Sequence, residues 1–351
     1  MDDTSKPVSS LRNLDDLVAA GLVRAGARAE LEGVVARYAI ALSPTMAALI
    51  DADDPNDPIA RQFIPSAAEL DHRPEEISDP IGDDVHSPVK GLVHRYRDRV
   101  LLKPLHTCPV YCRFCFRRER VGPDGAGTLS DAELASAFAY VAAHDEVFEV
   151  IVSGGDPLML SPRRVGAIAE AAARIGHVKV MRWHSRVPLV DPGRIATDLI
   201  AALKMFSGAV YVAVHANHPR EFTPAGKAAL ARLADAGIVL LSQTVLLKGI
   251  NNDAQVLEDL MRAFVANRVN PYYLHQGDLA PGTAQFRTTI AEGQALMRAL
   301  RGRLTGIAQP TYVLDLPGGH GKVPVGPDYE DGERIADPTG GWHDYPPKMA
   351  D

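Results

Sequence analysis

Three cysteines stand out by their spacing, because Cys108, Cys112 and Cys115 lie within eight residues and the chain has no other cysteine. An odd number in so short a stretch cannot form a disulfide framework, and such clusters usually bind metal or act in catalysis. Thiolates are the usual ligands of iron–sulfur clusters, and a [4Fe–4S] cluster takes four. Three protein ligands would leave one iron open to a substrate or cofactor. The alternatives are a zinc site with His106 as fourth ligand, or inert cysteines.

A glycine-rich turn at residues 153–156 follows one predicted strand. Adjacent glycines let a backbone approach a ligand closely, and the acidic residue after them could hold a ligand amine. The same run also makes a good turn, so the segment alone leaves both interpretations open. His215 and Gln243 end two later predicted strands, where each is either a ligand contact or a satisfied core residue.

A lysine, Lys322, ends the glycine-rich loop at residues 315–322. The loop is not a phosphate-binding P-loop, because Leu316 stands where that motif needs glycine and Val323 where it needs serine or threonine. A lysine presented in this way can form a Schiff base with an aldehyde; the alternative is a solvated lysine. The basic run at residues 94–99 has donors suited to a phosphate, or it is a solvated turn.

Short β-branched runs alternate with amphipathic helical stretches from about residue 95 onward, which predicts an α/β fold with a parallel sheet. About six such units favour a barrel or partial barrel, where loops at the carboxyl ends of the strands carry the chemistry. The cysteine, glycine and lysine motifs all fall on such loops. Strands are expected at residues 99–105, 148–153, 178–183, 209–214, 238–246, 271–274 and 311–314, and helices at 131–143, 162–175, 195–205, 224–235, 253–266 and 290–301.

The segments before and after the predicted barrel differ from it in composition and in the spacing of apolar residues. Apolar residues have helical spacing at 14–20 and 27–39, and the Pro- and Asp-rich stretch at 51–88 predicts short helices and turns. The tail after Lys322 is rich in Pro, Gly and Asp, which predicts irregular structure. We therefore expect an N-terminal helical cap at 1–94, the barrel at 95–322 and a C-terminal tail at 323–351.

The amino-acid composition limits the classes of protein to which the chain can belong. The net charge of −7 argues against a nucleic-acid surface, and 46% hydrophobic with 23% charged residues is normal for a soluble globular protein. The first residues lack a basic segment followed by an apolar one, and no apolar run approaches the roughly 20 residues that span a bilayer. We therefore expect a cytoplasmic protein that contacts neither nucleic acid nor membrane.

The Cys-x3-Cys-x2-Cys run after the first predicted strand resembles the signature of radical S-adenosylmethionine (SAM) enzymes, and residues 108–119 resemble the lysine 2,3-aminomutase family. The Pro-Gly-Gly-His-Gly-Lys run that ends at Lys322 is similar to the family's pyridoxal phosphate (PLP) lysine loop. The resemblance implies a radical SAM partial (β/α)6 barrel with an N-terminal helical segment. It also implies three cofactors, a [4Fe–4S] cluster, SAM and PLP.

The resemblance further implies a role for each matching residue. The three cysteines would bind the cluster, and Lys322 would form the PLP Schiff base. Arg117 would bind the substrate carboxylate, and Asp278 and Asp315 would bind the distal ammonium of lysine. The resemblance assigns SAM contacts to Ser153, Gly154, Gly155, Asp156, His215 and Gln243, and PLP phosphate contacts to Arg95, Tyr96 and Arg99.

The activity that the resemblance implies is isomerisation of L-lysine to β-lysine by migration of the amino group to the neighbouring carbon. Two aspartates would repel the distal carboxylate of glutamate, which argues against a glutamate aminomutase. The alternatives are formation of β-lysine for modification of elongation factor P, another amino acid such as arginine, or a non-catalytic metal-binding scaffold. The expected partners are a reductase, flavodoxin or ferredoxin as electron donor, and possible copies of the same chain. Assembly through the zinc site of longer members is not expected, since its additional cysteines are missing.

Overall fold

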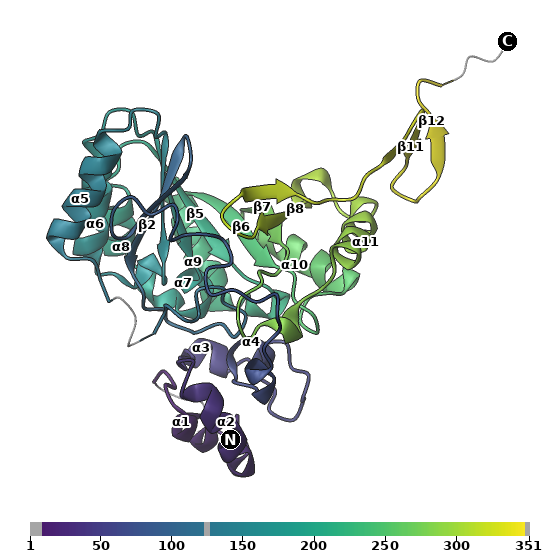
Figure 1. The fold of residues 1–351 in the computed structure, drawn as a ribbon, viewed down its shortest axis with the longest axis horizontal. Helices are drawn as coiled ribbons and strands as arrows, with labels where there is room; N and C mark the ends of the chain where they lie inside the picture. Colours follow the sequence, from purple (N-terminus) through teal and green to yellow (C-terminus); the bar gives the residue numbers. More distant parts are fainter. Residues whose placement is uncertain (1–8, 123–126, 348–351) are drawn as a thin grey trace.

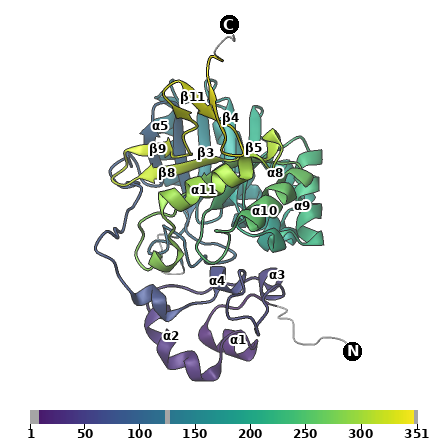
Figure 2. The ribbon, with the colours of Figure 1, turned by 90° about the vertical axis from the view of Figure 1, so that its right-hand side faces the viewer.

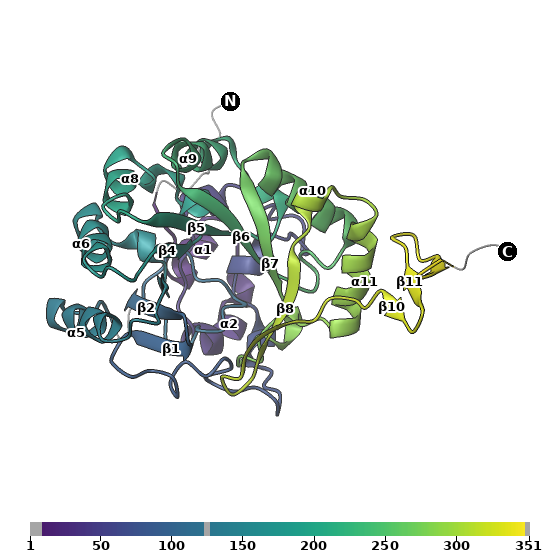
Figure 3. The same cartoon turned by 90° about the horizontal axis from the view of Figure 1, so that it is seen from above.

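The computed structural model describes residues 9–122 and 127–347 and contains a nine-stranded sheet with the order β1 to β9. Strands β2 to β8 are parallel, and β1 and β9 pair antiparallel at its two edges. Because the sheet curves without β1 pairing to β9, the barrel is partial, as predicted (Figure 3). The strands are β1 Leu92–Tyr96, β2 Arg99–Leu105, β3 Glu149–Gly154, β4 Val180–Ser185, β5 Ala209–His215, β6 Val239–Val245, β7 Val269–His275, β8 Thr311–Leu316 and β9 Gly321–Pro324.

Helices surround the outside of the sheet, and the six predicted ones are confirmed (Figures 1 and 3). Most begin at a Ser, Thr or Asp whose side chain accepts a hydrogen bond from the first turn, as Ser130 does for α5. They are α5 Asp131–Ala142, α6 Pro162–Ala173, α8 Thr197–Leu203, α9 Pro224–Asp235, α10 Ala254–Ala266 and α11 Ile290–Arg301, with a short α7 Val187–Val190 after β4. The short 3-10 turns are η1 Ala25–Ala27, η2 Ala67–Leu70, η3 Pro157–Met159, η4 Pro192–Arg194, η5 Pro219–Glu221, η6 Ala284–Phe286 and η7 Gly306–Ala308.

Along each strand, side chains point alternately to the hydrophobic core under the helices and to the cavity inside the barrel. On β4, Met181 and Trp183 are fully buried in the main hydrophobic core, whereas Arg182 and His184 line the internal cavity. Successive side chains of a strand point to opposite faces, so the apolar face packs on the helices and the polar face surrounds the cavity. No helix in the described part of the chain is both long and apolar enough to cross a membrane.

The N-terminal segment lies across the end of the barrel where the parallel strands finish (Figures 1 and 2). Its helices are α1 Leu14–Ala19, α2 Arg28–Val35, α3 Pro44–Ala47 and α4 Ala60–Phe63. Their buried apolar residues form one cluster with Val110 of the cysteine loop and Val190 of α7. The segment therefore covers the loops that carry the predicted site.

Two expectations about irregular segments were wrong. The tail is not irregular, because β10 Glu330–Asp331, β11 Arg334–Ala336 and β12 Trp342–Asp344 form a separate antiparallel sheet that projects from the barrel (Figure 1). Gly332 has φ +63°, which permits the tight turn between β10 and β11. The basic run at 94–99 is a hairpin of β1 and β2, not a turn ahead of the first strand. Both predicted domain boundaries fall inside strands, β1 and β9, and the division of the chain stays a prediction.

A buried carboxylate joins the N-terminal segment to the cysteine loop. Glu69 of η2 has no exposed surface and accepts hydrogen bonds from Arg113 at 2.5 to 3.1 Å and from Arg118. Arg113 directly follows Cys112, and Arg118 also donates to the carbonyl of Gly282 at 2.7 Å. One carboxylate thus holds two buried guanidinium groups that flank Cys115 in the sequence.

Replacing Glu69 by Gln tests this connection. The change leaves two buried guanidinium groups without a countercharge, so we expect a loss of about 3–5 kcal/mol in the free energy of unfolding. Denaturant titration of purified protein measures it. Asp235→Asn, which breaks an exposed pair with Arg268, is the control and should cost less than about 1 kcal/mol. Equal losses in both variants would contradict a special role for Glu69.

Candidate active site

A cavity of about 850 Å³ opens inside the barrel, and every residue predicted for the site lines it. The residues come from the β1–β2 hairpin, from the loops that follow β2 and β7, and from the carboxyl ends of the later strands. The structure therefore brings together groups that lie up to 227 positions apart in sequence. They are Arg95, Tyr96, Arg99, Cys108, Cys112, Cys115, Arg117, Ser153, Gly154, Gly155, Asp156, His215, Gln243, Asp278, Asp315 and Lys322.

The three cysteines are free and half-buried on the loop after β2. Their removal from water raises the pKa of each thiol, that of Cys115 to about 11, so bound metal would be needed to keep them as thiolates. Each cysteine of a cubane binds a different iron, so a cluster does not require three sulfurs that converge on one point. In the described ranges no three His, Cys, Asp or Glu side chains converge as ligands of a single ion.

Arg186, which the sequence did not reveal, contacts this loop directly. Its Nη1 donates to Cys112 Sγ at 2.9 Å, and its Nη2 donates to Glu221 at 2.6 Å and to Gln62 at 3.0 Å. The guanidinium is buried, so Glu221 balances its charge. A cation beside a cysteine sulfur favours the thiolate form that binds iron. Arg186 follows β4 immediately, and that position was its only sequence signal.

The glycine pair is required by the packing of the protein itself. A Cβ on Gly154 would lie 2.4 Å from the carbonyl oxygen of Leu105, and one on Gly155 would lie 2.4 Å from that of Thr107. Gly154 also has φ +107°, which disfavours any side chain. The glycines therefore let the β3 loop pack against the backbone that leads into the cysteines.

Asp156 lines the cavity, but protein donors already occupy its carboxylate. It accepts hydrogen bonds from Ser185 Oγ and the backbone N–H of Arg186 at 2.7 Å each, with longer bonds from two more N–H groups. Burial raises its pKa even so. In this arrangement Asp156 fixes the β4 loop and does not present a free oxygen to an amine. Its predicted SAM contact stays a prediction.

His215 and Gln243 differ in whether their polar atoms are satisfied. His215 Nε2 is buried, and the described residues offer it no hydrogen-bond partner. Burial lowers the pKa of His215 well below its usual value, so the ring is neutral. Gln243 Nε2 instead lies 3.2 Å from Nε2 of His275. An unsatisfied nitrogen in a cavity fits a missing ligand better than a core role.

Strand register places Lys322 in the cavity. Asp315 of β8 pairs directly with Lys322 of β9, and the two side chains form an ion pair. Lys322 Nζ also lies 3.1 Å from Nδ1 of His275, and the Lys322 N–H donates to the Tyr96 hydroxyl at 2.7 Å. The connecting loop reverses the chain through glycines with positive φ, such as Gly318 and Gly319. The lysine is therefore held at the site and is not a solvated loop residue.

The predicted phosphate-binding residues form one cationic wall. The Arg99 guanidinium stacks on the Tyr96 ring at 3.7 Å and donates to Asp98 at 2.7 Å. Arg95 donates to Asp83 at 3.2 Å, while its buried Nε has no partner among the described residues. A buried unsatisfied guanidinium N–H fits an anion such as the phosphate of PLP.

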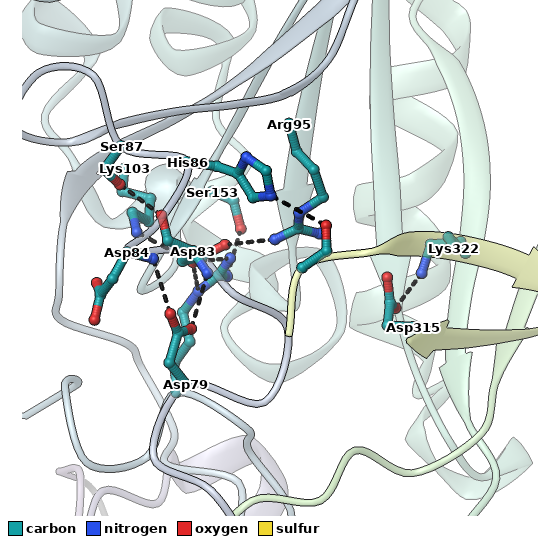
Figure 4. A network of polar contacts seen from close by, with 12 residues as sticks. Asp79, Asp83, Asp84, His86, Ser87, Arg95, Lys103, Ser153, Asp315 and Lys322 are labelled. Carbon is teal, nitrogen blue, oxygen red and sulfur yellow. Dashed lines mark hydrogen bonds and ion pairs between the residues drawn. The ribbon is translucent and has the colours of Figure 1, made fainter. Parts of the chain in front are cut away.

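Asp83 was missed by sequence reasoning, and it organises this side of the cavity (Figure 4). It accepts hydrogen bonds from Arg95 at 3.2 Å, Lys103 at 3.1 Å and Arg117 at 3.0 and 3.1 Å. Burial favours the neutral acid, but Arg117 and Lys103 outweigh it and hold the pKa of Asp83 far below its usual value. Three cations share one anion, so this wall carries excess positive charge.

The opposite wall is acidic. Burial and the nearby Asp315 raise the pKa of Asp278 to about 7. Burial also acts to raise the pKa of Asp315, but His275 and the Lys322 ammonium outweigh it and keep it below its usual value. A cation placed beside Asp278 would lower that pKa and favour the charged carboxylate.

The central part of the chain is similar to radical SAM enzymes. The family model described as "Radical SAM superfamily" matches residues 102–265, and the model described as "Lysine-2,3-aminomutase" matches residues 297–331. Among solved structures, a radical SAM methyltransferase from Sphaerobacter thermophilus covers 64% of this chain and 68% of its own, at 19% identity and a TM-score of 0.43. The assignment to the radical SAM class rests on the family-model match and on the cysteine loop.

Several named relatives of the chain are 2,3-aminomutases. The L-lysine 2,3-aminomutase of Acetoanaerobium sticklandii is 41% identical over 83% of this chain and 70% of its own. That of Clostridium subterminale is 41% identical over 86% and 72%, and the glutamate 2,3-aminomutase of Clostridioides difficile is 36% identical over 85% and 70%. The chain belongs to the lysine 2,3-aminomutase family, and it is a radical SAM 2,3-aminomutase, an isomerase.

Membership in this family implies a [4Fe–4S] cluster, SAM and PLP. The cavity fits them on independent grounds. It joins three free thiols to an unsatisfied histidine nitrogen, a lysine amine and an unsatisfied arginine N–H. The predicted zinc alternative and the scaffold alternative explain only the thiols.

Gly155→Ala tests whether the β3 loop positions the cysteines. The new methyl group would press on the backbone of Thr107, so we expect a loss of about 1–3 kcal/mol in stability and a clear fall in bound iron after reconstitution. Iron and sulfide analysis gives the readout. Gly193→Ala is the control, because a Cβ there meets nothing within 4 Å. Full iron loading in Gly155→Ala would show that the contact does not matter for the cluster.

Proposed function

We propose that this enzyme converts L-lysine to β-lysine. The observation that carries the proposal is the ammonium group of Lys322, which already sits against Asp315 in the cavity, with Asp278 as a second carboxylate beside it. A distal ammonium would be attracted to this wall, whereas the distal carboxylate of glutamate would be repelled. Relatives named L-lysine 2,3-aminomutase support the same choice.

The opposite wall supports the other end of the substrate. Arg117 lies beside the cysteine loop, is half-buried and shares Asp83 with two further cations, so an added carboxylate would improve the local charge balance. We assign the substrate carboxylate to Arg117 and the distal ammonium to Asp278 and Asp315. A free amino acid bound in this way would be fixed at both ends, which holds its reacting carbons in one place.

The cofactor roles follow the family. Bound SAM and cluster supply the adenosyl radical, and bound PLP carries the migrating nitrogen. We assign the cluster to the three cysteines, the Schiff base to Lys322 and the phosphate to Arg95, Tyr96 and Arg99. The residues at 153–156, with His215 and Gln243, are assigned to SAM. The electron donor, the oligomeric state and the cytoplasmic location stay predictions.

The substrate assignment is tested by incubating the reconstituted, reduced enzyme with SAM, PLP and one amino acid at a time. We expect β-lysine from L-lysine and no product from L-glutamate or L-arginine, as identified by NMR. Conversion of glutamate would overturn the assignment of the acidic wall. Product from arginine would show that the wall accepts cations of another shape.

Reduction with borohydride tests the role of Lys322. If Lys322 forms the Schiff base, reduction fixes PLP on the peptide that contains it, and mass spectrometry detects the added mass. Lys322→Ala should lose the label and the Schiff-base absorbance, because no other lysine lines the cavity in the described part of the chain. The exposed Lys227→Ala on α9 is the control and should keep both. A label retained in Lys322→Ala would refute the assignment.

Binding of lysine should depend on pH through Asp278. Its pKa of about 7 in the ligand-free enzyme means that the carboxyl is mostly protonated below neutral pH, and a bound ammonium must displace that proton. Affinity for lysine should therefore fall by up to about tenfold per pH unit below 7 and level off above it. Calorimetry in buffers of different ionisation enthalpy measures the released proton. Asp278→Asn should bind more weakly at neutral pH and without this proton release.

A further inference from the structure

His275 is a third contact of the ammonium group at the acidic wall. Its Nδ1 lies 3.1 Å from Lys322 Nζ and 3.5 Å from Asp315 Oδ2. The Lys322 ammonium also faces the ring of Tyr273, with its nitrogen 5.4 Å from the ring centroid. A cation in this place therefore meets a carboxylate, an imidazole nitrogen and an aromatic face.

The sheet holds His275 in this position. It is the last residue of β7, only 8% exposed, and it pairs with Val313 of β8. Asp315 is two residues further along β8, so its side chain lies on the same face of the sheet. Lys322 is directly opposite Asp315 on β9. Register thus places the three groups together without help from a mobile loop.

The hydrogen-bond partner of Nε2, on the far side of the His275 ring, determines whether Nδ1 can accept a hydrogen bond. The side-chain amide nitrogen of Gln243 lies 3.2 Å from His275 Nε2. The oxygen and nitrogen of an amide are exchanged by turning it over, and the Lys322 ammonium can only donate to Nδ1, so the turned amide, with its oxygen toward Nε2, satisfies both sides of the ring. The ring proton is then on Nε2, and the lone pair of Nδ1 faces the ammonium. Burial and the Lys322 charge lower the pKa of His275 to about 4, so the ring is a neutral acceptor at neutral pH.

We propose that His275 is a specificity-determining residue, which accepts a hydrogen bond from the distal ammonium of the substrate. The ammonium of Lys322 stands in for that group in the ligand-free enzyme. This inference rests on the proposed function, because it assumes a substrate with a distal ammonium. Three acceptors in different directions suit the tetrahedral N–H groups of an ammonium and do not suit a planar guanidinium, which prefers both oxygens of one carboxylate.

The test compares two ligands on three proteins. L-lysine and L-norleucine share the same carbon chain, but norleucine lacks the distal amine. Both are titrated by calorimetry into PLP-loaded enzyme without SAM or reductant, so that no turnover occurs. The proteins are the wild type, His275→Leu and His275→Asn, and the amide oxygen of Asn can occupy the place of Nδ1.

We expect His275→Leu to weaken lysine binding by about ten- to a hundredfold and to leave norleucine binding unchanged, because only lysine loses a hydrogen bond to a charged group. His275→Asn should restore most of the difference. Norleucine binding also reports that the variant site is intact. Equal losses for both ligands, or no loss for lysine, would overturn the proposal. A wild type that binds norleucine as well as lysine would overturn the proposed function itself.

Discussion

The enclosure of charged groups inside the barrel is the constraint on which the rest of the structure depends. A charge taken out of water must be paired, and the cavity pairs its charges incompletely on both sides. Asp83 pairs with Arg95, Lys103 and Arg117, whereas on the other side Lys322 pairs with Asp315 and leaves Asp278 without an ion pair among the described residues. One wall lacks anions and the other lacks a cation. A ligand with a carboxylate at one end and an ammonium at the other complements both walls.

Around the cysteine loop, buried ion pairs hold the site together. Glu69 binds Arg113 and Arg118, which flank Cys115, and Glu221 binds Arg186, which donates to Cys112. These pairs join the N-terminal segment and the loops after β4 and β5 to the cysteine loop. The cysteines are thus positioned by residues distant in sequence, and the glycine pair after β3 removes the steric obstacle to that packing.

Much of the fold and of the site could be predicted because the signals were local. Short β-branched runs predicted the seven parallel strands, amphipathic stretches between them predicted the helices, and the cysteine, glycine and lysine motifs were expected on loops at strand ends. Asp83, Arg186 and His275 gave no such signal. Asp83 lies in a stretch with many aspartates, and its role depends on cations at 12, 20 and 34 positions away. The backbone donor that Arg186 offers to Asp156 likewise cannot be read from the sequence around Asp156.

The acidic wall also shows why a lysine-binding site and a reactive lysine can share one place. Lys322 and a substrate lysine carry the same ammonium group, so the carboxylates that attract the substrate also attract Lys322. Burial and the neighbouring Asp315 raise the pKa of Asp278 to about 7, while the Lys322 charge acts to lower it. When Lys322 is engaged by PLP, as assigned above, the distal ammonium of the substrate can take the place beside Asp315 that Lys322 occupies in the ligand-free enzyme. A substrate without a distal cation would leave this place without a countercharge for the two carboxylates.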